Sequence, residues 1–107
     1  MVTATGKITE AGIVSMGENI KEVCGQNGLT GTIVDCAAIE GALEPMELYH
    51  ATNKFIDIVG NIKVAYINPP EEWTPDDDQF SRDVAYNRGG ALEVFASLED
   101  AEKWLNS

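Results

Sequence analysis

The stretch from Thr32 to Pro45, T-I-V-D-C-A-A-I-E-G-A-L-E-P, decides the fold. Its first four residues, Thr32–Asp35, predict a short strand buried on both faces, as in a parallel sheet that helices cover. We expect a loop over Asp35–Glu44 and then a helix that begins at Pro45, because proline suits the first helical position. Ligands of parallel α/β sheets usually bind beyond the carboxyl ends of the strands. This loop is therefore the first place to expect a site.

The rest of the chain repeats this order of strand and helix. Strands are predicted at Val2–Thr5, Ile62–Ile67 and Leu92–Ala96, and helices begin after the capping residues Thr9, Thr74 and Ser97. The sequence predicts an α/β domain of four successive β-α units, in which a small, mostly parallel sheet is flanked by helices. With 107 residues the chain suits a single domain, residues 1–107.

The charge of the chain limits its partners. Lys and Arg number 7 against 18 Asp and Glu, which gives a net charge of -11. A surface this acidic argues against nucleic acid and against an anionic membrane surface. No apolar run approaches the ~20 residues of a membrane span. The first residues lack the apolar segment of a signal peptide, so we expect a cytoplasmic protein.

The residues that commonly bind metals or catalyse reactions are few. Cys24 and Cys36 are not in a C-x-x-C spacing, and His50 is the one histidine, so no zinc-type ligand set is predicted. We interpret both cysteines as reduced structural thiols and His50 as part of a solvated helix face. The acidic run Asp76–Asp78 fits the first turn of a helix better than a calcium loop, because it lacks spaced oxygen ligands. No cofactor is predicted.

Three segments carry a resemblance to a known family. They are the strand end Ile33–Asp35, the helix end Asn87–Gly89, and the strand and capped helix of Val94–Leu105. Together they resemble the STAS, or SpoIIAA-like (anti-sigma-factor-antagonist-like), family, in its branch of small bacterial proteins without an assigned role. The resemblance implies a SpoIIAA-like fold and a regulatory module that binds another protein.

The chain departs from this family in two ways. STAS proteins generally begin with a strand before the one predicted at Val2–Thr5. Regulated members also carry a phosphorylatable Ser or Thr ahead of the second helix, whereas this chain has none between Thr32 and Thr52. A kinase-controlled switch is therefore in doubt, although Glu40 or Glu44 could mimic the charge of a phosphate.

The candidate ligand- or partner-binding residues are Asp35, Cys36, Glu40, Glu44 and Trp73. A catalytic Cys36 is disfavoured, because its acidic neighbours oppose formation of the thiolate. Trp73 either forms an exposed contact or folds back onto the core, and the sequence leaves both open.

Two functions follow as leading hypotheses. The first is a non-enzymatic protein-interaction module that forms a homodimer, because a missing first strand would leave a sheet edge open. The alternative is a carrier or sensor of a small apolar, lipid-like ligand, because the SpoIIAA-like fold resembles lipid-transfer domains of the CRAL-TRIO type. An enzyme that uses Cys36 or Asp35 is the third hypothesis.

Overall fold

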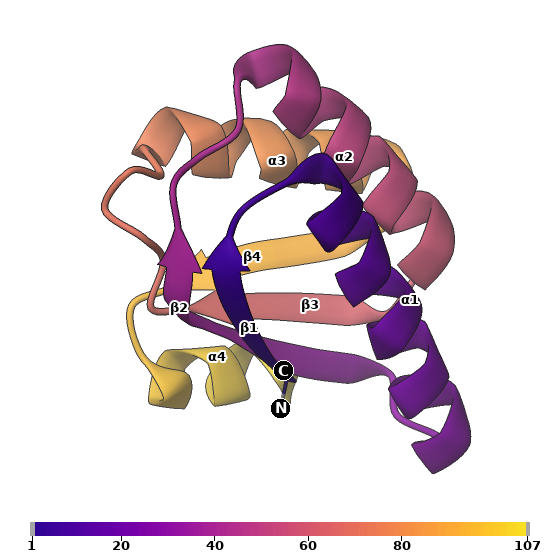
Figure 1. Cartoon of the computed structure of the whole chain (residues 1–107). Helices are drawn as coiled ribbons and strands as arrows, with labels where there is room; N and C mark the ends of the chain where they lie inside the picture. Colours follow the sequence, from indigo (N-terminus) through magenta and orange to yellow (C-terminus); the bar gives the residue numbers. More distant parts are fainter. Residues whose placement is uncertain (1, 107) are drawn as a thin grey trace.

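Strands and helices alternate along the whole chain in the computed structural model, which describes residues 2–106 (Figure 1). This order confirms the predicted α/β fold of four β-α units. The elements are β1 (Val2–Lys7), α1 (Glu10–Asn27), β2 (Gly31–Glu40), α2 (Pro45–Val59), β3 (Lys63–Ile67), α3 (Pro75–Asn87), β4 (Ala91–Phe95) and α4 (Leu98–Leu105).

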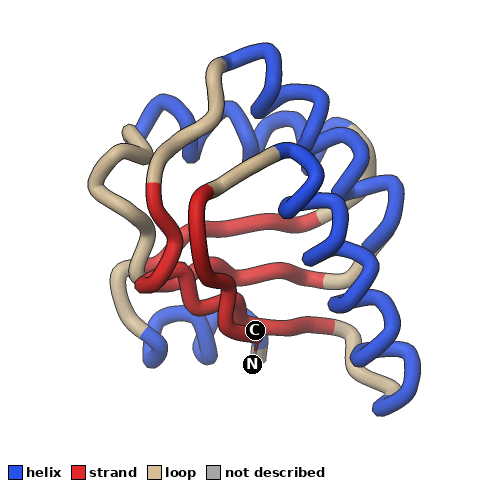
Figure 2. Tube along the Cα trace, viewed as in Figure 1, coloured by secondary structure: helices blue, strands red, loops and turns tan. Residues whose placement is uncertain are grey.

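The four strands form one sheet in the order β1-β2-β3-β4, and every pair is parallel. Because each new strand is added on the same side with crossovers of one hand, α1, α2 and α3 lie on one face of the sheet. Helix α4 follows the last strand and covers the other face (Figures 1 and 2). The molecule therefore has three layers, with the four-stranded sheet in the middle.

Successive side chains of each strand face opposite sides of the sheet, so the protein has two hydrophobic cores. The larger core, under the three helices, is built on alternate strand residues, such as Val64 and Tyr66 of β3, and on Phe55 of α2. The smaller core, under α4, uses the intervening residues Ala65 and Ile67. The described chain has no helix long and apolar enough to cross a membrane.

The helix ends follow the side-chain chemistry that predicted them. The Thr9 hydroxyl accepts a hydrogen bond from the Gly12 N–H at 2.9 Å, and Gly28 ends α1 in the left-handed conformation. Helix α3 begins with a capping box, in which the Asp77 N–H donates to the Thr74 hydroxyl and the Thr74 N–H donates to the Asp77 carboxylate.

Two predicted strand ends were wrong. Strand β2 does not stop at Asp35 but continues to Glu40, which leaves only residues 41–44 as the loop before α2. Strand β1 likewise continues through Gly6 to Lys7, because the backbone of Gly6 and Lys7 pairs with the extension of β2. Both errors have one cause, since the two extensions pair with each other.

A β-bulge in β2 changes which side chains face the three helices. Thr3 pairs with Asp35, but Thr5 pairs with Ala38, so two residues of β2 lie opposite Ala4 alone. The extra residue reverses the alternation, and Ile39 rather than Ala38 packs against the larger core. The bulge thus directs Ile39 toward the space beneath the helices.

Candidate functional site

An apolar cavity of about 340 Å³ lies between the sheet and the three helices that cover it. This volume is at the lower end of the ~300–1,000 Å³ typical of small-molecule sites. Its walls come from all four strands, from the inner faces of α1, α2 and α3, and from the loops that follow β2 and β3. Apolar lining residues include Ile13, Met16, Ile39, Leu43, Leu48, Phe55, Trp73, Leu92 and Val94.

The loop before α2 and the loop before α3 both contribute to the cavity wall, and Trp73 joins them. The Trp73 indole Nε1–H donates to the Gly41 carbonyl oxygen at 3.0 Å, which joins the two loops. The Trp73 ring also meets Tyr66 edge to face, with 6.3 Å between ring centroids. Trp73 therefore folds back over the core and forms part of the cavity wall, the second of its two predicted placements.

Several polar side chains in this wall, among them Thr52, Asp78, Tyr66 and Ser81, have no hydrogen-bond partner among residues 2–106. Thr52, in the middle of α2, is only 5 % exposed. Asp78, on α3, is half-buried, and burial followed by the neighbouring Asp77 raises the pKa of its carboxyl group. An apolar cavity with a few polar groups is the usual composition of a small-molecule site.

The other predicted site residues do not line this cavity. Cys36 is fully buried in the larger core, and burial together with the charge of Asp35 raises the pKa of its thiol to about 12. The thiol is thus protonated at neutral pH and unsuited to act as a nucleophile. Cys24 is buried in the same core, and both thiols are free, as the sequence indicated.

Asp35 has a structural role at the bulge. Its carboxylate accepts hydrogen bonds from the Ala37 N–H at 3.0 Å and from the Asn68 side-chain amide at 3.2 Å. These donors hold the pKa of Asp35 below its usual range, because they stabilise the charged form. The residue therefore joins the bulge in the middle of β2 to the loop after β3.

The two candidate glutamates also belong to the framework. Glu40 is exposed at the end of β2, and its main chain pairs with that of Lys7. Glu44 is the N-cap of α2, and its N–H donates to the Glu47 carboxylate at 3.4 Å. The structure thus brings Trp73 to the cavity and places Asp35, Cys36, Glu40 and Glu44 around or beneath it.

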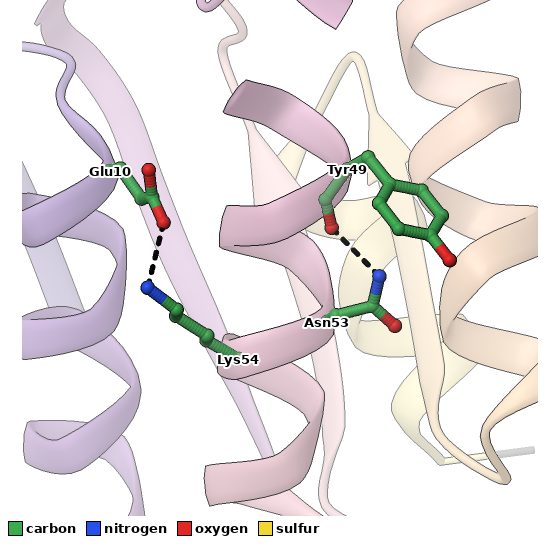
Figure 3. A network of polar contacts seen from close by, with 4 residues as sticks. All are labelled: Glu10, Tyr49, Asn53 and Lys54. Carbon is green, nitrogen blue, oxygen red and sulfur yellow. Dashed lines mark hydrogen bonds and ion pairs between the residues drawn. The ribbon is translucent and has the colours of Figure 1, made fainter. Parts of the chain in front are cut away.

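The outer face of α2 joins the neighbouring helices, as Figure 3 shows for its contact with α1. Lys54 forms an ion pair with Glu10 of α1 at 2.9 Å, and Asp57 pairs with Arg88 at the end of α3. His50 lies exposed on the same face beside the ring of Tyr49. Within residues 2–106, no three His, Cys, Asp or Glu side chains converge as metal ligands.

The polar cavity residues Thr52 and Asp78 were not predicted as site residues. Asp78 was interpreted as part of an acidic first turn, which describes the exposed Asp76, whereas Asp77 and Asp78 are half-buried and line the cavity. Thr52 gave only the weak signal of a polar residue within the apolar stripe of a helix, between Leu48 and Phe55.

No protein-family model, curated protein or solved structure matches this chain. The resemblance to STAS proteins therefore stays a prediction. Fold and site together define the class of the molecule: a three-layer parallel α/β domain with an apolar cavity under three helices.

Proposed function

We propose that this protein binds a small, largely apolar molecule in the cavity beneath α1, α2 and α3, as a carrier or sensor rather than an enzyme. The cavity itself is the observation that carries the proposal. Filling such a space with an apolar ligand removes apolar surface from water on both molecules, at roughly 25 cal/mol per Å². Neither thiol of the chain, Cys24 nor Cys36, lines this space, which favours binding over covalent chemistry.

The two tryptophans make the proposal directly testable. Trp73 lines the cavity, whereas Trp104 packs beside Phe95 on the opposite face of the sheet. In a Trp104→Phe background the fluorescence reports on Trp73 alone. We expect decanol, added below its solubility limit, to change this emission saturably and to raise the melting temperature.

A matched pair of variants separates cavity binding from surface binding. Ala4 lines the cavity, so Ala4→Leu should fill part of it and weaken decanol binding. Ala38 is exposed on the neighbouring strand and does not line the cavity, so Ala38→Leu adds the same apolar group without closing it. Equal decanol affinity in both variants, or none in the parent, would count against the proposal.

A protein-interaction role is the second candidate, and the edge position of β1 favours it. Because β1 has only β2 beside it, one side of its backbone is open to another strand, and Thr3 and Thr5 are exposed. We propose a homodimer that pairs through this edge. Its mass in light scattering should increase with salt, which screens the repulsion between two chains of net charge -11. A monomeric mass at micromolar concentration in both low and high salt would contradict the dimer.

A further inference from the structure

Thr52 places a hydroxyl at the cavity wall. The residue is 5 % exposed, and its hydroxyl, like that of the buried Tyr66, makes no hydrogen bond within residues 2–106. It sits on the inner face of α2, among cavity residues such as Leu48 and Phe55. A hydroxyl without a protein partner at a cavity wall is free to bind a polar group of a ligand or a water molecule.

Asp78 adds a charged group from the adjacent helix. Its carboxylate lines the same cavity and accepts no hydrogen bond from residues 2–106. Asp77 differs, since its carboxylate already accepts the Thr74 N–H in the capping box. Asp78 therefore retains its full acceptor capacity toward whatever occupies the cavity.

We propose that the ligand is an amphiphile with an apolar body and a hydrogen-bond donor head group, a protonated amine above all, which binds the Asp78 carboxylate while Thr52 contacts a polar atom of the ligand. This inference rests on the proposed function and names the chemical class of its ligand. Hydrogen bonds to a charged group are about twice as strong as neutral ones, so an ammonium head group should outrank a hydroxyl.

The charges around the cavity disfavour an anionic head group. Asp77 and Asp78 line it against one lining cation, Lys7, which is exposed at the end of β1, while Arg82, which also attracts Asp78, does not line it and forms an ion pair with Glu93. The main chain of Lys7 is in register with that of Glu40, which adds another negative charge nearby. The net charge of -11 also repels anions at a distance.

Three probes with one apolar tail test the head group: decylamine, decanol and decanoate. Binding is followed by Trp73 fluorescence in the Trp104→Phe background and by calorimetry, at concentrations below micelle formation. We expect affinities in the order amine, alcohol, carboxylate. The Asp78→Asn variant should bind decylamine roughly tenfold more weakly, the scale of one lost hydrogen bond to a charged group, and should weaken decanol binding less, because asparagine still accepts a hydrogen bond from a neutral hydroxyl.

Asp76→Asn is the matched control, because Asp76 is exposed on the same turn and does not line the cavity. It removes one negative charge and should leave decylamine affinity nearly unchanged. Decanol binding that Asp78→Asn weakens less than decylamine binding shows that the variant is folded with its cavity intact.

The outcomes separate this inference from the proposed function. Equal affinity of all three probes, or equal losses in Asp76→Asn and Asp78→Asn, would overturn the head-group assignment and leave apolar binding standing. The head-group assignment would also be overturned if the protein preferred decanoate and lost that preference in Lys7→Gln. Failure of all three probes to bind would refute apolar binding itself.

Discussion

Replacing Thr52 by valine should stabilise the ligand-free protein. Valine keeps the size and branching of threonine, and the two residues have similar helix propensities. The change therefore removes mainly a hydroxyl group that is buried in an apolar wall without a partner. Mutational data place the cost of such a hydroxyl at about 1–3 kcal/mol. Since the cavity leaves room for water beside the hydroxyl, we expect the lower end, a gain of about 1 kcal/mol.

Urea denaturation followed by circular dichroism measures this gain. The midpoint should rise while the slope of the free energy of unfolding against urea stays constant, because the variant exposes the same surface on unfolding. For a domain of about 100 residues, 1 kcal/mol corresponds to roughly 4–8 °C in melting temperature.

The Thr52→Ser variant supplies the control for packing. Serine keeps the hydroxyl and loses a buried methyl group, which should cost about 1 kcal/mol. If valine instead destabilises the protein by 1 kcal/mol or more while serine is neutral, the hydroxyl has a satisfying partner such as an ordered water. That result would refute the reasoning that an unsatisfied group awaits a ligand.

Three further outcomes test other parts of the structure. Asp35→Asn should lower the urea midpoint at pH 7, because the Ala37 and Asn68 donors depress the pKa of Asp35 in the folded state. The stabilisation that the Asp35 carboxylate gives the folded protein is therefore present above the unfolded-state pKa and is lost as the pH falls through the folded-state pKa. The deficit of this variant should therefore shrink in acid, and a constant deficit from pH 7 to pH 2 would contradict the assignment. Cys36 should resist thiol reagents in the native protein and react only on unfolding, measured by mass spectrometry of the labelled peptide; rapid native labelling would contradict its burial. Phe55→Ala should cost about 3–5 kcal/mol in urea denaturation, because the ring is 1 % exposed in the larger core, and a cost below 1 kcal/mol would show a looser core.

Local chemistry made the fold predictable from sequence. Helix starts at Thr9, Thr74 and Ser97 depend on side chains that bond to the backbone within three residues, so a short window contains the whole signal. The order of strand and helix then limits the sheet to few arrangements. A few neighbouring residues do not show which strands pair with each other. The extensions of β2 to Glu40 and of β1 to Lys7 depend on such pairing and were therefore not predicted.

The cavity is a property of packing and has no motif. It exists where the inner faces of three helices and the sheet fail to fill the space between them, and small residues such as Ala4 and Gly12 contribute to its walls. A small residue that faces a void and one that faces a close neighbour look identical in sequence. Gly17 illustrates the second case, because a methyl group there would meet the Phe55 ring at 3.0 Å.

The rule for parallel sheets led to a segment that borders the cavity, although most of the candidate side chains in that segment do not line it. The segment from Asp35 to Glu44 does border the cavity, through Ile39 and Leu43. Which of its side chains face inward depends on strand alternation and on the bulge, and Asp35 creates that bulge by binding the Ala37 N–H. The acidic residue that looked functional therefore acts on the backbone, and an apolar residue four positions later forms the wall. If the proposed ligand binds here, we expect this wall to recognise it by shape and apolar contact and Asp78 of α3 to select its head group.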